Sequence, residues 1–217
     1  MGEEGRWINA TQKAFLYFSD ESYHLPNRLE QLDVNPKDVD IVVASHLHLD
    51  HAGCLEYFTN ATVIVHDDEF SGATKCYARN QQEGAYIWSD IDVWIKSDLT
   101  WQTIARDQDH LMLVSGVKVL NFGSGHAWGM IGLEIESEAL GTLILASDAI
   151  YTQESMAPKL QTSRIIYDSI GWANSVEYIK RLAKEKTQKS GLVMAAINLS
   201  LLESLLMVIM SKGCENK

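Results

Sequence analysis

The stretch ASHLHLDHAG, residues 44–53, places three histidines and one aspartate within six positions. These four side chains are His46, His48, Asp50 and His51. They follow DIVVAS, residues 40–45, a β-branched run that predicts a buried strand. So many imidazole and carboxylate groups would be costly to bury without partners, and together they are the ligands that zinc and similar divalent metals prefer. The stretch therefore predicts a metal site in the loop at the end of a strand.

Two further motifs supply ligand-type side chains from distant segments. GSGHAWG, residues 123–129, places His126 in a glycine-rich turn just beyond an apolar strand. LILASDAIY, residues 143–151, places Asp148 at the end of another apolar strand, where a carboxylate can bridge two cations. The alternative for Asp148 is a cap of a turn or helix. The remaining histidines are interpreted as ordinary surface or core residues: His24, His66 and His110.

The hydrophobic pattern predicts strands and helices that alternate irregularly along the chain. The expected helices span 26–33 and 169–187, the second with Ile170, Val176 and Ile179 on its apolar face. The expected strands span 40–45, 61–66, 130–137 and 141–149, with a hairpin over 111–126 that turns at Ser115-Gly116. Residues 77–110 are aromatic and give no clear assignment. Antiparallel runs with interspersed helices favour an α/β layered fold over a doubly wound one.

Taken together, SHLHLDHAG, GHAWG and SDAIY resemble the signature of the metallo-β-lactamase superfamily. LPNRLEQLDVNPKDVDIVVASHLHLDHAG, residues 25–53, the strand FTNATVIVH, residues 58–66, and Tyr151 resemble more closely its N-acyl homoserine lactonase-like branch. The resemblance covers about residues 25 to 190. It implies an αββα sandwich in a single domain over 1–217, with residues 1–25 poorly patterned. It also implies a metal-dependent hydrolase that opens a lactone or a similar ester.

The resemblance distributes the ligand-type side chains over two zinc ions, one of the side chains being shared. The first ion would be held by His46, His48 and His126, the second by Asp50 and His51, and Asp148 would bridge both. A hydroxide held between the metals would attack the ester carbonyl.

Two residues would have further roles in catalysis. Asp50 would orient the hydroxide and pass its proton to the leaving alkoxide. Tyr151 would donate a hydrogen bond to the substrate carbonyl or the developing oxyanion. The alternative for Tyr151 is a half-buried aromatic residue whose hydroxyl lies in solvent.

The chain departs from the family pattern at both ends. Only 45 residues precede His46, so the sandwich is expected to be missing its first strands, through truncation or with a partner over the gap. No histidine follows His126, although the family's last ligand is a histidine in a GHD-like turn after the long helix. We therefore expect one tightly bound and one weakly bound metal. The apolar segment 191–217 is atypical and is compatible with a packed helix or a frameshifted end, whereas Asn198 and Glu203 disfavour a membrane span.

Composition narrows the partners and the compartment. A formal net charge of −11 argues against nucleic acid, so the expected partner is a small lactone or ester, with a homodimer left open. Three unevenly spaced cysteines and the polar start MGEEG favour a cytoplasmic protein without a signal peptide. Alternatives to a lactonase are another ester or thioester hydrolase, as in glyoxalase II-like members, and a non-catalytic remnant. A substrate panel and the metal content per chain distinguish them.

Overall fold

The computed structural model describes residues 22, 24–81, 84–156, 161–163, 165–190 and 193–196, whose strands form two sheets. The smaller sheet is parallel throughout, in the order β1 (Ile41–Val43), β2 (Thr62–His66), β3 (Thr100–Ile104). The larger sheet runs in the order β4 (His110–Val114), β5 (Val117–Gly123), β6 (Met130–Ser137), β7 (Gly141–Leu145), β8 (Val193–Ala196). Adjacent strands of this sheet are antiparallel, except that β7 and β8 are parallel to each other.

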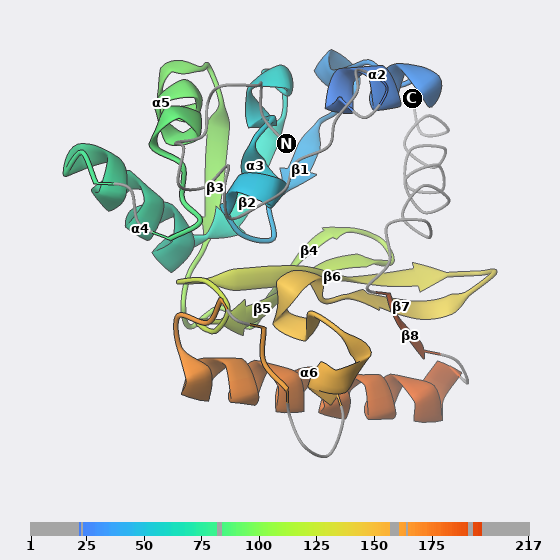
Figure 1. Ribbon diagram of the computed structural model, residues 1–217. Helices are drawn as coiled ribbons and strands as arrows, with labels where there is room; N and C mark the ends of the chain where they lie inside the picture. The colour runs from blue at the N-terminus through green and yellow to red at the C-terminus, as the bar shows by residue number, and fades with distance from the viewer. Residues whose placement is uncertain are drawn as a thin grey trace.

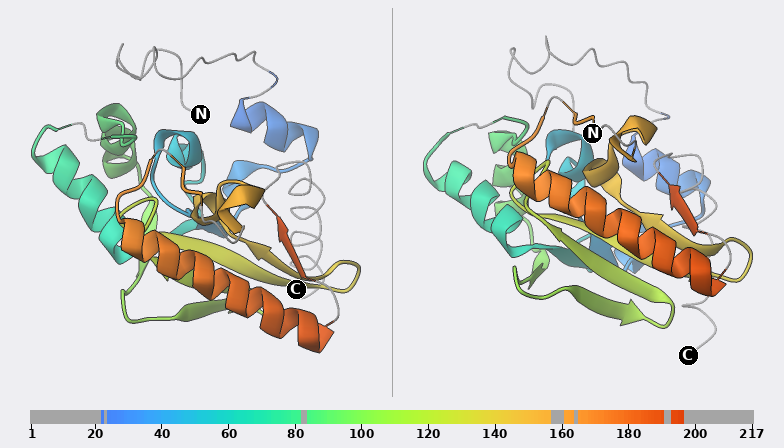
Figure 2. Two further views of the ribbon diagram at one scale, coloured as in Figure 1. Left: turned by 60° about the horizontal axis from the view of Figure 1, so that its bottom comes forward. Right: turned by 90° about the horizontal axis from the view of Figure 1, so that it is seen from below.

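Helices cover the outer faces of the two sheets. The helices are α2 (Leu25–Gln31), α3 (Leu49–Ala52), α4 (Asp67–Ala78), α5 (Trp88–Lys96) and α6 (Ser169–Ser190). Short 3-10 turns are η2 (Pro36–Asp38), η3 (Leu55–Tyr57), η4 (Ser147–Ile150) and η5 (Gln153–Met156). In Figure 1, α6 lies below the larger sheet, while α4 and α5 lie beside the smaller sheet. Figure 2 shows α6 running along that larger sheet, so the layers follow the predicted αββα order.

Strand β2 contributes to two apolar interfaces, one between the smaller sheet and its helices and one between the two sheets. Its residues alternate in direction, as side chains of a strand do. Val63 and Val65 pack in the cluster that contains Trp94 of α5, on the helix side. Ile64 packs instead with Ile131 of β6, between the sheets. A strand buried on both faces reads as a continuous β-branched run, which is why TVIVH was recognisable.

The long helix α6 closes the other side of the sandwich. Trp172, Val176 and Ile179 are buried in one cluster with Phe122 and Ile144 of the larger sheet. Their spacing is that of a single helical face, which confirms the predicted amphipathic helix. The prediction was wrong for one residue of the expected apolar face, Ile170, which is 74% exposed because it lies in the first turn of α6.

Most predicted elements are confirmed with boundaries shifted by a few residues, including α2, β1, β2 and the hairpin formed by β4 and β5. The unassigned region 77–110 contains α5 and β3. Residues 1–21 lie outside the described residues, so the expected lack of the first strands stays a prediction; segment 191–217 is described only at β8. Among the helices that the structure describes, none is both long enough and apolar enough to cross a bilayer.

Candidate metal centre

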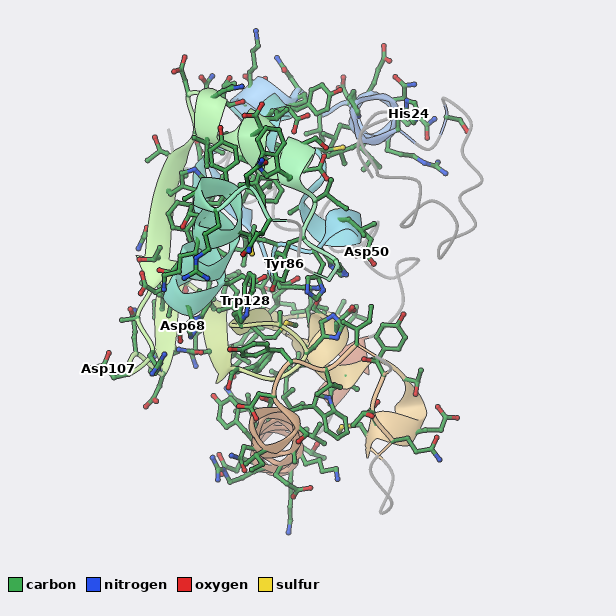
Figure 3. All side chains as sticks on the ribbon, turned by 60° about the vertical axis from the view of Figure 1, so that its left-hand side comes forward. His24, Asp50, Asp68, Tyr86, Asp107 and Trp128 are labelled. Carbon is green, nitrogen blue, oxygen red and sulfur yellow. The ribbon has the colours of Figure 1, made fainter. Side chains whose placement is uncertain are left out.

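Three loops bring the ligand-type side chains together where strands of both sheets end. One loop follows β1, the second follows β5 and the third, η4, follows β7. The first carries His46 and His48, the second His126 and the third Asp148, while Asp50 and His51, which were expected in the loop after β1, lie in the short helix α3 that follows this loop. In the view of Figure 3, Tyr86 and Trp128 lie between Asp50 on one side and Asp68 on the other.

The first group of ligand atoms consists of three buried imidazoles. His46, His48 and His126 each offer a ring nitrogen, and these nitrogens lie within 4.8 Å of one another. Nδ1 of His48 is 3.0 Å from Nε2 of His126. Nε2 of His46 is buried and has no hydrogen-bond partner in the described part of the chain. A buried nitrogen without a partner is costly, and a divalent metal would satisfy it, so this donor set fits the ion that the sequence predicts.

A second group lies beside the first and shares His46 with it. The group comprises His46, His51 and Asp148, again with ligand atoms within 4.8 Å. Oδ2 of Asp148 is 3.2 Å from Nε2 of His126, 3.5 Å from Nε2 of His51 and 3.9 Å from Nε2 of His46. One carboxylate therefore faces both groups, as a bridging ligand would. Oδ2 of Asp50 is 3.7 Å from Nε2 of His51, and the Asp50 side chain is 54% exposed.

The buried histidines are held in their neutral form. Burial, helped by the neighbouring His126 and His51, lowers the pKa of His48 to about 3. Burial, with the three surrounding histidines, also places the pKa of His46 well below its usual value. Burial lowers the pKa of His126 as well, although Asp148 opposes the shift. Neutral imidazole is the form that ligates a metal, so these nitrogens do not first have to lose a proton at neutral pH.

His51 and Asp148 form a charge-complementary pair. Burial lowers the pKa of His51, but the hydrogen bond with Asp148 and the negative charge of Asp50 outweigh burial and raise it. Burial raises the pKa of Asp148, yet the hydrogen bond from His51 and the adjacent histidines bring it below the usual value. Asp148 is therefore an ionised carboxylate, as ligation requires.

Serine hydroxyls hold the rings in place, and sequence reasoning missed them. Ser45 Oγ lies 3.2 Å from Nδ1 of His46, which leaves Nε2 of His46 for a metal. Ser147 Oγ donates to Ser45 Oγ at 2.9 Å and so connects the loop of His46 to the loop of Asp148. Ser147 has a φ of 48°, a left-handed conformation that non-glycine residues rarely adopt. The available signal was only that Ser45 directly precedes His46 and Ser147 directly precedes Asp148.

Tyr151 and the other histidines complete the surroundings. Tyr151 is 50% exposed, and its ring stacks near that of His126 with centroids 6.4 Å apart. His66 accepts a hydrogen bond from the backbone N–H of Asp68 at 3.1 Å and thereby caps α4, an ordinary structural role as expected. His24 and His110 are exposed.

The comparisons with known proteins concern the sequence and the fold of the chain. The family described as the metallo-beta-lactamase superfamily matches residues 10–67. N-acyl homoserine lactonase AiiB from Rhizobium rhizogenes is 38% identical over 187 residues, which cover 86% of this chain and 68% of the relative. N-acyl homoserine lactonase AttM from Rhizobium radiobacter is 32% identical over 76% of this chain and 62% of its own length. The chain thus spans about two thirds of the length of these relatives.

Comparison with solved structures shows that a lactonase has a similar fold. A mutant of AiiA from B. thuringiensis, with N-decanoyl-L-homoserine bound at its active site, superposes with a TM-score of 0.67 and 26% identity. The match covers 85% of this chain and 66% of that one. The two-sheet sandwich and its cluster of histidines and aspartate define a member of the metallo-β-lactamase superfamily. Within that superfamily, the chain belongs to the family of the N-acyl homoserine lactonases.

Proposed function

We propose that this protein is a metal-dependent hydrolase that opens the ring of an N-acyl homoserine lactone or a closely similar ester. The observation that carries the proposal is the convergence of three buried neutral imidazoles with Asp148 in the fold of the lactonases. A related N-acyl homoserine lactone hydrolase holds the product N-hexanoyl-L-homoserine at its catalytic metal centre, with a TM-score of 0.67 to this chain.

The chain offers ligands for two metal ions. We assign the first to His46, His48 and His126, and the second to Asp50 and His51, with Asp148 shared. A divalent metal held by these residues would polarise an ester carbonyl and bring the pKa of a bound water close to neutrality. Zinc is the proposed ion, because three imidazoles form a ligand set that zinc commonly uses in hydrolases.

Asp50 and Tyr151 would handle the proton and the negative charge. During ring opening, an oxygen from water bonds to the lactone carbonyl carbon, and the ring carbon–oxygen bond breaks. Asp50 lies beside His51 with more than half of its side chain exposed, so it can accept the proton of the attacking water and return it to the released alkoxide. Tyr151 is half exposed beside His126, where its hydroxyl can donate to the carbonyl oxygen as negative charge develops. The product is a hydroxy acid.

We also propose a cytoplasmic location. The three cysteines are unevenly spaced in the sequence and show no pattern of a disulfide framework, which favours a reducing compartment. The single domain over 1–217, the absence of nucleic-acid partners and the homodimer stay predictions from the sequence.

The proposed function is tested with purified, zinc-loaded protein and a substrate panel. The panel contains an N-acyl homoserine lactone, a glutathione thioester and a β-lactam, and acid release is followed with a pH indicator. We expect the lactone to be opened with the highest kcat/KM and His48→Ala to abolish the reaction. Faster hydrolysis of the thioester would instead identify a glyoxalase II-like enzyme. Bound metal without hydrolysis of any member would identify a non-catalytic protein.

A further inference from the structure

A fully buried carboxylate lies close to the candidate metal centre without belonging to it. Glu69, in the first turn of α4, is 0% exposed. Neither group of candidate metal ligands in the described part of the chain includes it. Burying a carboxylate is expensive unless several donors satisfy its oxygens, so the identity of those donors indicates what Glu69 does.

The donors to Glu69 come from both loops that carry the three-histidine group. The backbone N–H of Leu47, between His46 and His48, donates to Oε1 at 2.8 Å. The backbone N–H of Gly129, in the loop that contains His126, donates to Oε2 at 3.1 Å. One side chain therefore fixes the backbone of the two loops relative to each other.

A third donor connects Glu69 to a ring that contacts the site. The hydroxyl of Tyr86 is 2.9 Å from each carboxylate oxygen of Glu69. The Tyr86 ring packs edge to face against His48, with centroids 4.7 Å apart, and stacks on Trp128 at 4.0 Å. Figure 3 shows Tyr86 and Trp128 close together in the interior. Glu69 thus orients a side chain that in turn limits the position of the His48 ring.

The close approach of the second loop requires its glycine. A Cβ on Gly129 would collide with Nδ1 of His66, whose ring caps α4. Only a residue without a side chain can therefore bring this backbone N–H to the α4 carboxylate. Gly129, the last residue of GHAWG, and Glu69, in HDDEF, therefore form one contact, although they lie far apart in the sequence.

We infer that Glu69 is a positioning residue for the candidate metal centre: by accepting from Leu47, Gly129 and Tyr86, it holds the loop of His46 and His48 at the distance from His126 that one metal ion requires. The inference rests on the proposed function only in that it takes these three histidines as ligands. It concerns metal affinity and site geometry rather than substrate choice.

The experiment compares Glu69→Gln with Glu134→Gln. An amide at position 69 must turn its NH₂ group toward one of the three donors, so at least one hydrogen bond is lost without a change in size. Glu134, on β6, is the matched control because it is also a buried carboxylate, but its partners are Lys118 at 3.0 Å and Lys186 at 2.6 Å. Both variants replace a buried carboxyl group that accepts hydrogen bonds, and only Glu69 contacts the histidine loops.

Zinc affinity is measured by competition with a chromophoric chelator, and the site geometry by the visible spectrum of the cobalt-substituted protein. We expect Glu69→Gln to weaken zinc binding about 10- to 100-fold, the usual effect of losing a group that orients ligands, and to change the cobalt spectrum. Glu134→Gln is expected to lower the unfolding midpoint while its zinc affinity and cobalt spectrum match those of the unmodified protein. Tyr86→Phe removes one donor and retains the ring, so it tests the inference if Glu69→Gln fails to fold; its affinity should fall by a smaller factor.

Several outcomes would overturn the inference, and they are distinguishable from failure of the proposed function. Unchanged zinc affinity and an unchanged cobalt spectrum in both Glu69→Gln and Tyr86→Phe would remove the positioning role. An equal loss of affinity in Glu134→Gln would show a general effect of stability instead. If the unmodified protein bound no zinc, the proposed function itself would fail.

Discussion

Oδ2 of Asp148 lies 3.5 Å from Nε2 of His51, so the turn η4 after β7 faces the short helix α3, which follows β1. The same oxygen is 3.2 Å from Nε2 of His126, in the loop that follows β5. Strands from both sheets therefore contribute to one centre, and the sandwich has to be assembled before any ligand set is complete. Metal binding should accordingly report on correct packing of the two sheets, because an unfolded chain does not preform such a site.

Replacing His48 with alanine should remove most of the bound metal. His48 is buried and its Nδ1 lies 3.0 Å from Nε2 of His126, so its loss breaks the three-histidine group. The measurement is elemental analysis after dialysis, with the exposed His110→Ala as the control that keeps its metal. Full metal content in His48→Ala would show that the ligands are assigned wrongly.

Asp50→Asn should reduce hydrolysis more steeply than it reduces metal binding. The Asp50 side chain is largely exposed and close to His51, so its proposed contribution includes proton transfer as well as ligation. General acid–base groups typically contribute about 10²- to 10⁴-fold to a rate, and a loss in that range is expected in kcat. The check is kcat measured at saturating metal, alongside metal content. A variant that retained both its rate and its metal would refute the role.

Tyr151→Phe should cause a moderate loss confined to the rate. The ring can keep its stacking on His126, while the hydroxyl that would stabilise the oxyanion is removed. Loss of one such donor costs about 10²- to 10³-fold in kcat where the donor is fully aligned, and a half-exposed residue should approach the lower limit. The measurement is kcat for lactone hydrolysis at saturating substrate, in Tyr151→Phe and in the unmodified protein. An unchanged kcat would return Tyr151 to the role of a surface aromatic.

Metal-free protein should lose stability as the pH falls. The pKa of His48 is about 3 in the folded chain against a usual value of 6.5, so between these values the unfolded chain binds a proton that the folded chain does not. The contribution of His48 to stability is thus complete above about pH 6.5 and decreases toward about pH 3. Urea unfolding of chelator-treated protein at about pH 5 and about pH 7.5 should show the difference, reduced in His48→Ala. Equal differences in the two proteins would contradict a buried neutral His48.

The ligand-type side chains could be identified from the sequence because they are dense and follow recognisable strands. His46 and His48 lie in the loop after β1 and His51 in the short helix α3 that follows it, and the end of an apolar strand in a sandwich is a place where distant loops meet. His126 and Asp148 stand in the same position after their own strands. Periodicity also gave the face of α6 that packs on the sheet, except at its first turn.

The supporting residues could not be identified in the same way. A glutamate in the first turn of a helix is ordinarily explained by the helix dipole, and only the fold reveals that Glu69 is buried beneath two loops. Serines such as Ser45 and Ser147 have many common roles in turns, and their contact joins segments far apart in the chain. The region around α5 and β3 was unassigned because its aromatic residues pack in the core beside α4, which local pattern does not encode.

The last prediction concerns the second metal. No histidine follows His126 in the 217 residues, and the resemblance to the family placed a further histidine ligand after the long helix. The proposed ligands of the second metal are therefore Asp50, His51 and the shared Asp148, with Oδ2 of Asp148 3.5 Å from Nε2 of His51. Losing a ligand should weaken the second metal by at least the 10- to 100-fold that loss of a supporting group costs, about 1.4–2.7 kcal/mol or more.

We therefore expect close to one tightly held zinc per chain, with a second that is removed by a weaker chelator, and slow lactone hydrolysis that rises with added zinc. A competitive chelator titration of the purified chain measures both affinities, and His51→Ala is the matched variant, because it should abolish only the weaker phase. Brisk hydrolysis together with two equally tight ions would contradict the prediction and would mean that another residue of this chain completes the second site.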